Sequence, residues 1–212
     1  MKFSKETLAL LKNFASINTN IVFKQGDTVS TISNLKNIFA KATIKESIPN
    51  EFAIYDLNSL LAMLTLIENQ DVEFGDKCLT VTSSSGRFEF YYSNPEIVTG
   101  APSGEIQHTS VYKFKMTAED AQMLMKAAAI LQLPNLTFAG EDNKITVKAH
   151  NAKDPSADIY KVELGDIEKD CNLTFRVDNI KLLPGDYTVK SSGKQFGEFK
   201  ADDVTYWVAA ES

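Results

Sequence analysis

The order of predicted elements occurs twice along this chain of 212 residues, and that repetition restricts the possible folds more than any other feature. Hydrophobic periodicity within residues 1–93 predicts a helix, three strands, a second helix and three further strands. Residues 111–212 predict the same order after an additional strand at 111–116, with a second helix of only one or two turns. We therefore expect an α+β fold made of two similar antiparallel domains.

Residues 94–110 separate the two halves. They follow neither a helical nor a strand period, and they contain two prolines and two glycines. Such a composition is typical of a linker. The expected organisation is an N-terminal domain over residues 1–93, a connector over 94–110 and a C-terminal domain over 111–212.

Polar residues stand at the start of each predicted helix. Ser4, Asp56, Thr117 and Asp178 can each accept hydrogen bonds from the amides of a first turn. Asp56 and Asp178 both follow an alternating strand and both precede a pair of leucines by four and five residues, so we expect them to be equivalent in the repeat. The same periodicity predicts that the helix after Thr117 has a buried face made of Met123, Leu124, Ala127, Ile130 and Leu131.

Charge is spread unevenly over the chain. The net charge is −6 and the pI is about 5.0, which argues against a protein that grips nucleic acid from bulk solution. Residues 1–50 nevertheless carry +4, so the remainder of the chain carries −10. The chain is an acidic body with a locally basic part.

The outward faces of the predicted helices differ in character. At 100° per residue, Lys5 and Lys12 fall on one arc of the first helix, opposite its apolar face, and Lys126 faces away from the apolar side of the helix after Thr117. The helix after Asp56 instead presents a narrow uncharged stripe. Helix faces that are simply exposed to solvent could also carry these lysines and this uncharged stripe. The residues of the uncharged stripe are Asn58, Ala62, Thr65 and Asn69.

Catalytic and metal-binding patterns are absent from the sequence. It contains no glycine-rich phosphate loop, no HExxH motif and no GxSxG motif. Its only histidines, His108 and His150, have no cysteine or histidine at ligand spacing, and the acidic pairs at 141–142 and 202–203 fall in predicted turns. We expect no catalytic residue, no metal and no cofactor, and we interpret the chain as a binding or scaffolding protein.

Features of secreted or membrane proteins are also lacking. No apolar run approaches the length needed to cross a bilayer, and the N-terminus does not resemble a signal peptide. Cys78 and Cys171 lie far apart without clustering, which suits reduced thiols in a cytosol.

Two stretches and the duplicated plan resemble a known family. The stretches MKFSKETLALLKNFASIN at 1–18 and FAIYDLNSLLAML at 52–64 are similar to the sliding clamps of T4-type bacteriophages, the DNA polymerase processivity factors. The resemblance extends over essentially the whole chain and is less specific in the second half. It implies the DNA-clamp fold, with sheets outside and helices lining a channel around double-stranded DNA. Rings of this type contain six such domains, so two per chain imply a head-to-tail homotrimer without enzymatic activity.

The resemblance also implies partners and sites. Lys5, Lys12 and Lys126 become the expected DNA-channel residues, together with Lys181 on the short fourth helix. The expected partners are the replicative DNA polymerase and a clamp-loader ATPase, in the cytoplasm of the infected bacterial host. Clients of the family insert a hydrophobic peptide into a pocket between the two domains. Two of the candidate pocket residues, Tyr206 and Val208, could equally be ordinary core residues. The residues expected to form that partner-peptide pocket are Ile97, Val98, Pro102, Tyr206 and Val208.

One alternative comes from a different class of protein. A virion structural or assembly protein built from a duplicated α+β domain would need no DNA, and the lysines on the channel face are the feature that discriminates the two readings.

Overall fold

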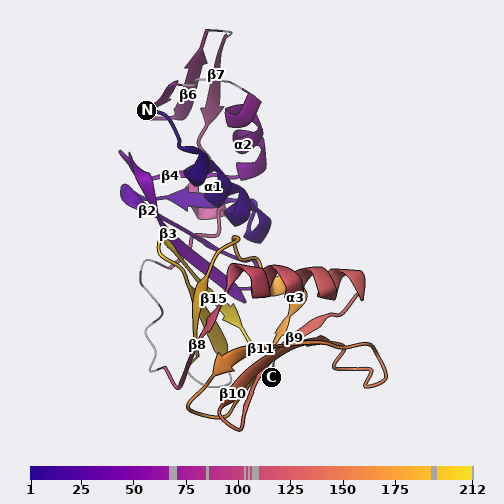
Figure 1. Ribbon diagram of the computed structural model, residues 1–212. Helices are drawn as coiled ribbons and strands as arrows, with labels where there is room; N and C mark the ends of the chain where they lie inside the picture. Colours follow the sequence, from indigo (N-terminus) through magenta and orange to yellow (C-terminus); the bar gives the residue numbers. More distant parts are fainter. Residues whose placement is uncertain are drawn as a thin grey trace. The chain divides into compact units, whose positions relative to one another are not determined.

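The computed structural model describes residues 1–66, 71–84, 86–102, 104, 106, 110–191 and 195–211 (Figure 1). The chain divides into two compact units, Met1–Gly104 and Glu105–Ser212, and this boundary lies inside the segment expected to be a connector. Both units combine helices with antiparallel strands. The expected α+β composition is confirmed.

In the first unit, two helices lie side by side over short antiparallel sheets (Figure 1). Strand β1 pairs with β4, β2 pairs with β3, and β5, β6 and β7 form a three-stranded sheet in that order. The elements are α1 (Lys5–Ile17), β1 (Ile21–Phe23), β2 (Gly26–Ile32), β3 (Ile38–Ile48), β4 (Phe52–Ile54), α2 (Leu57–Leu66), β5 (Asp71–Phe74), β6 (Cys78–Ser83), β7 (Gly86–Tyr91) and the 3₁₀ turn η1 (Pro95–Ile97).

The core of the first unit is filled by apolar side chains from both helices and by a stack of aromatic rings. Phe52 stacks between Phe23 and Tyr92, with ring centroids 4.8 Å and 4.6 Å away. Four leucines of α2 at helical spacing are all buried. Asn69, which the sequence places on the uncharged stripe of this helix, lies outside the described residues. The buried leucines of α2 are Leu57, Leu60, Leu61 and Leu64.

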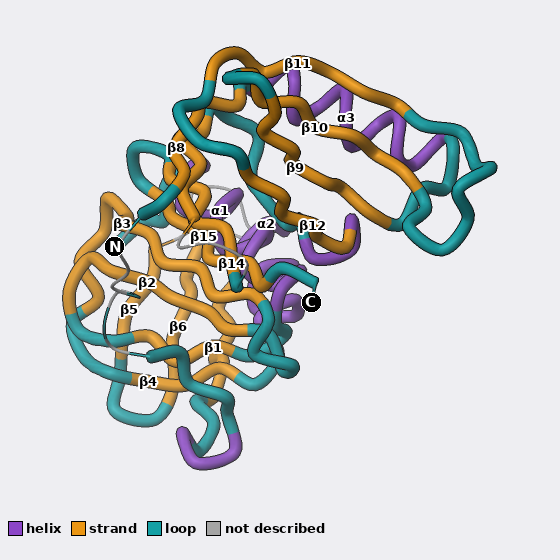
Figure 2. Tube along the Cα trace, turned by 90° about the horizontal axis from the view of Figure 1, so that it is seen from below, coloured by secondary structure: helices purple, strands orange, loops and turns teal. Residues whose placement is uncertain are grey.

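In the second unit, α3 covers β10 and β11 of a four-stranded sheet with the order β11-β10-β9-β12, whose strands run side by side in Figure 2. Strands β8, β13, β14 and β15 form a second antiparallel sheet in that order. The elements are β8 (Tyr112–Met116), α3 (Ala118–Ile130), β9 (Asn135–Glu141), β10 (Lys144–His150), β11 (Tyr160–Asp166), β12 (Cys171–Arg176), the 3₁₀ turn η2 (Val177–Asn179), β13 (Tyr187–Ser191), β14 (Phe196–Lys200) and β15 (Val204–Ala209).

Hydrogen bonds outside the regular elements repeat between the units and identify equivalent positions. The amide of Ser93 donates to the carbonyl of Ala53 at 2.9 Å, just as Glu211 donates to Thr174 at 2.7 Å. Residue Met1 exchanges two hydrogen bonds with Val72 of β5. Met1 thus lies beside β5 in the first unit as β8 lies beside β13 in the second. A third equivalent pair joins Leu57 to Thr19 at 2.8 Å and Val177 to Pro134 at 2.9 Å.

The expected fourth helix does not form. Because Val177 matches Leu57, the cap position of Asp56 is taken by Arg176 rather than by Asp178, and no side chain caps η2. A guanidinium has no acceptor for the first-turn amides, so the signal that starts α2 is missing here. Asp178 forms an ion pair with Arg176 at 3.5 Å instead. Pro184 then follows too closely for a regular helix to develop.

The missing helix explains a second difference from the sequence prediction. Met123, Ile130 and Leu131 were expected on the buried face of α3, but they are 46%, 79% and 39% exposed. Helix α1 packs against both α2 and strands, whereas α3, among the described elements of its unit, packs against strands alone. Its neighbours therefore bury a narrower stripe of the α3 surface than the sequence predicted. Leu124 and Ala128 form that stripe. An apolar hollow of about 460 Å³ lies between α3 and residues 180–184.

Candidate nucleic-acid interface

Helix α1 presents two lysines to solvent from a face opposite its buried one. Lys5 and Lys12 are exposed and seven residues apart, so they lie one above the other along the helix. Among the described residues, no ion pair engages either ammonium group. Both charges are therefore available to an anionic ligand.

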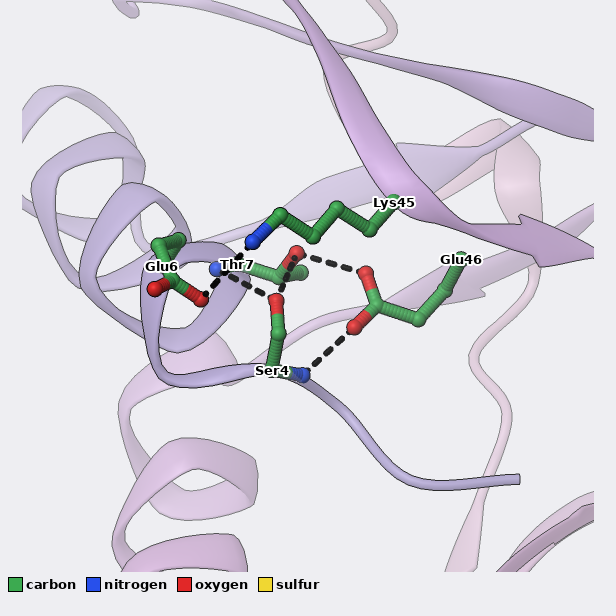
Figure 3. Close-up of polar contacts among 5 residues, drawn as sticks. All are labelled: Ser4, Glu6, Thr7, Lys45 and Glu46. Carbon is green, nitrogen blue, oxygen red and sulfur yellow. Dashed lines mark hydrogen bonds and ion pairs between the residues drawn. The ribbon is translucent and has the colours of Figure 1, made fainter.

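The first turn of α1 is held by a buried carboxylate from β3 (Figure 3). Glu46, only 8% exposed, accepts hydrogen bonds from the amide of Ser4 and, at 2.6 Å, from the hydroxyl of Thr7. The hydroxyl of Ser4 in turn caps the helix by accepting from the Thr7 amide at 3.2 Å. On the outside of this network, Lys45 and Glu6 pair at 3.4 Å, an exposed contact of little energetic weight.

Burial alone would raise the pKa of the Glu46 carboxyl, but the hydrogen bonds from Thr7 and Ser4 outweigh that effect and hold the pKa below its usual range. Glu46 is therefore ionised at neutral pH. Its negative charge lies at the helix N-terminus, where the helix dipole favours it.

Sequence reasoning missed Glu46, although the signal was present. Ala42, Ile44 and Ile48 point into the core at every second position of β3, and Glu46 belongs to the same series. A lone carboxylate in an apolar alternation indicates a polar partner arriving from another element.

Helix α2 supplies an uncharged wall next to Lys12. Asn58, Ala62 and Thr65 are exposed, as the sequence predicted, and Asp56 caps the helix by accepting from the amide of Ser59 at 3.1 Å. Together with Lys12 they line one shallow groove of about 640 Å³. Such a groove can pass a polyanion while offering few fixed contacts, because the lysine is a mobile point charge beside neutral side chains.

The remaining expected channel lysines are placed differently from each other. Lys126 is exposed on α3, whose start is secured by a capping box in which Thr117 and Asp120 exchange hydrogen bonds. Lys181 is not on a helix, contrary to the sequence prediction, because η2 ends at Asn179. It is half-buried in the irregular segment that follows.

The residues expected to form the partner-peptide pocket range from exposed to fully buried. Ile97 is 63% exposed at the end of η1, Pro102 is exposed, and Val98 is buried. Tyr206 and Val208 are both 0% exposed, and the Tyr206 hydroxyl accepts a hydrogen bond from the Leu183 amide at 3.3 Å. Their side chains belong to the core of the second unit.

Catalytic or metal-binding arrangements do not occur in the described part of the chain, where no three histidine, cysteine, aspartate or glutamate side chains gather. His150 shares a hydrogen bond of 2.7 Å with the hydroxyl of Thr137, and burial, aided by Lys148, lowers its pKa. Burial raises the pKa of the Cys171 thiol. No described helix combines the length and apolarity that spanning a membrane requires.

Comparison with known proteins decides the family. Residues 4–93 match the family described as DNA polymerase processivity factor, and residues 113–212 match the C-terminal part of the gp45 sliding clamp. The chain is 32% identical to the sliding clamp of Vibrio phage KVP40 over 100% of both chains. The chain belongs to the phage sliding-clamp family. It is also 31% identical to the sliding clamp of Escherichia phage RB69 and 32% identical to that of Enterobacteria phage T4, covering all of this chain and 97% of each relative.

Solved structures agree on the clamp fold. The proliferating cellular nuclear antigen of Entamoeba histolytica superposes with a TM-score of 0.70 at 16% identity, over 97% of this chain and 94% of that one. The A. fulgidus counterpart, solved with the C-terminal region of FEN-1 bound, gives 0.75 at 13% identity, over 100% and 97% of the two chains. These identities establish the fold alone.

The protein is thus a sliding clamp that provides processivity to a DNA polymerase in phage replication, and it is not an enzyme. Membership of this family implies association with DNA and with a polymerase. The full-length matches decide against the alternative of a phage structural or assembly protein.

Proposed function

We propose that three copies of this chain close head to tail into a ring that encircles double-stranded DNA without reading its sequence. The observation that carries the proposal is the groove in which Lys12 of α1 lies beside the neutral face of α2. Lys5 is exposed on the same face of α1. Two units per chain require three copies for a six-domain ring, and a head-to-tail contact repeats until its rotation closes.

Two edge strands support a contact between copies. Among the described strands of its own unit, β7 pairs only with β6, and β11 pairs only with β10. Both carry apolar side chains that remain partly exposed on the core side: Phe88 and Phe90 on β7, Val162 and Leu164 on β11. An uncovered edge of this kind invites pairing with another chain, and pairing would also complete the burial of these side chains.

The small number of lysines suits sliding. Lys5, Lys12 and Lys126 would meet phosphates as hydrated, mobile charges, and Lys181 would contribute from its irregular segment. Few phosphate contacts keep the affinity low, so the closed ring, rather than binding strength, would retain the clamp on DNA. The neutral residues of α2 would act as a spacer toward the DNA.

Partner contacts follow from the same proposal. A clamp-loader ATPase would open and close the ring, and the replicative polymerase would be tethered by a hydrophobic peptide bound near the connector. Ile97 and Pro102 are the exposed members of the predicted pocket, whereas Val98, Tyr206 and Val208 are buried. The site of action would be the cytoplasm of the infected bacterium.

Charge reversal on α1 tests the DNA-facing role. We expect Lys5→Glu with Lys12→Glu to leave the native mass unchanged and to abolish stimulation of the polymerase on primed circular DNA. Lys36→Glu with Lys77→Glu is the matched control, because both are exposed turn lysines of the same unit. Full stimulation by the α1 variant, or equal loss in the control, would contradict the assignment.

Native mass in solution tests the assembly separately. A trimer has about three times the chain mass of 23.5 kDa, which light scattering after size exclusion resolves easily. A strict monomer at high concentration would remove the ring from the proposal.

A further inference from the structure

Four lysines gather on one face of the sheet formed by β8, β13 and β14. Along β8, Phe114 and Met116 point into the core, so Lys113 and Lys115 point outward. On the neighbouring strands, Lys190 and Lys200 lie on the same outward face. We call this surface, Lys113, Lys115, Lys190 and Lys200, the lysine face.

The pairing register places like charges against each other. Lys113 lies directly opposite Lys190, and Lys115 lies opposite Thr188, which is itself opposite Lys200. Like charges directly opposite each other destabilise a sheet. Glu198 reduces the repulsion between Lys113 and Lys190 by forming an ion pair with Lys190 at 3.3 Å. Within the described ranges, no ion pair involves the other three lysines.

This concentration of positive charge occurs in a chain with a net charge of −6. It therefore runs against the overall balance of the protein, and among the described residues no ion pair offsets the charges of Lys113, Lys115 and Lys200. An anionic ligand from outside would remove that repulsion.

The lysine face is hollowed rather than flat. All four lysines line a depression of about 540 Å³, together with the hydroxyl-bearing Thr117 and Thr188. Two carboxylates, Asp186 and Asp202, also line it. The Asp186 carboxylate already accepts a hydrogen bond from the Ala118 amide at 2.7 Å.

The two carboxylates discriminate between possible anions. A nucleic-acid strand carries a charge at every residue, so it would bring phosphates against Asp186 and Asp202. None of the described residues lining the depression is an exposed aromatic on which a base could stack, since Tyr187 is buried. A peptide with separated carboxylates can instead place hydroxyl or neutral side chains opposite the two aspartates.

We propose that the lysine face binds an acidic segment of a partner protein. Carboxylates of the segment would pair with Lys113, Lys115 and Lys200, and the depression would accommodate the intervening small residues. The proposal concerns a sheet surface distinct from the α1 and α2 groove, and it does not depend on ring closure.

Binding of a defined probe tests the proposal. The probe is a fluorescein-labelled ten-residue peptide of alternating glutamate and serine, followed by fluorescence anisotropy with the full chain at low salt. We expect Lys113→Gln with Lys115→Gln to weaken binding by about tenfold. Lys153→Gln with Lys169→Gln removes the same charge from exposed positions of the same unit and should leave binding within about twofold.

Thermal unfolding supplies an independent readout. Because Lys113 faces Lys190, we expect Lys113→Gln alone to keep or raise the melting temperature while weakening the probe. This variant keeps the test valid if the double variant fails to fold.

Three results would overturn the proposal. They are absence of peptide binding to the wild-type chain, an equal loss of binding in the Lys153 and Lys169 control, and tighter, Lys113-dependent binding of a ten-nucleotide single strand than of the peptide. The last result would assign the lysine face to nucleic acid instead.

Discussion

Replacing Glu46 by glutamine tests how the candidate DNA-facing helix is held in place. The side chain of Glu46 joins β3 to the first turn of α1, one residue from Lys5, by accepting from both Ser4 and Thr7. Glutamine has nearly the same shape but only one acceptor atom. It can satisfy one of the two donors, and it turns an amide NH₂ group toward the other.

The expected cost follows from the contacts. One charge-assisted hydrogen bond contributes about 1.5–3 kcal/mol, and at 8% exposure little of that is screened by water. We therefore expect Glu46→Gln to lower the free energy of unfolding by about 2 kcal/mol. For a chain of this size the melting temperature should fall by about 4–8 °C. Glu73→Gln, an exposed carboxylate of the same unit, should stay within about 0.5 kcal/mol of wild type.

The pH dependence follows from the sign of the pKa shift. The folded-state pKa of Glu46 lies below the ordinary value of 4.5, so its stabilising contribution is complete above about pH 4.5. It is lost as the pH falls through the folded-state pKa. The difference in unfolding free energy between wild type and Glu46→Gln should therefore be constant near neutrality and shrink in acid, as measured by urea denaturation across the pH series.

Two outcomes would refute this reasoning. One is wild-type stability of Glu46→Gln at neutral pH, which would mean that the carboxylate contributes nothing beyond its shape. The other is a stability difference that persists undiminished at about pH 3, which would mean that ionisation is irrelevant to it. Amide exchange at Thr7 would then show whether the first turn of α1 is held by other contacts.

Two further substitutions test packing and helix initiation in the second unit. Gly197→Ala would place a Cβ 2.8 Å from Cζ of Phe175, so urea denaturation should show a loss of about 1–3 kcal/mol, whereas Gly185→Ala, with no neighbouring atom within 4 Å, should be silent. Thr117→Ala removes the capping box of α3 and should cost about 1 kcal/mol by the same measurement, with Thr117→Ser restoring most of it. Equal stability of Gly197→Ala and Gly185→Ala would contradict the packing prediction, and equal stability of Thr117→Ala and Thr117→Ser would contradict the capping prediction.

Much of the secondary structure could be predicted from the sequence because its signals are local. Ser4, Asp56 and Thr117 each cap the helix that the sequence assigns to them, since a side chain and the amides it accepts from lie within three residues. Alternation likewise predicted the strands, and the repeated order predicted two similar α+β units. The family resemblance added the clamp function, which periodicity alone could not supply.

Local signals failed to predict which residues of the two repeats occupy equivalent positions in the fold. Asp178 looks like Asp56 in sequence, but the hydrogen bonds of the fold place Arg176 at that position, and the fourth helix is lost. The exposure of Met123 and Ile130 follows from the same loss, because burial depends on which element packs alongside.

Local capping and periodicity therefore determined where α1, α2 and α3 begin and that Lys5, Lys12 and Lys126 lie on outward helix faces. Only the tertiary structure decided that Glu46 reaches the start of α1 and that Lys12 meets the neutral face of α2. It also brought the four lysines of the sheet together from strands far apart in the sequence. The reason is physical: capping and alternation act over a few residues, whereas strand register and helix packing join segments that no local pattern connects.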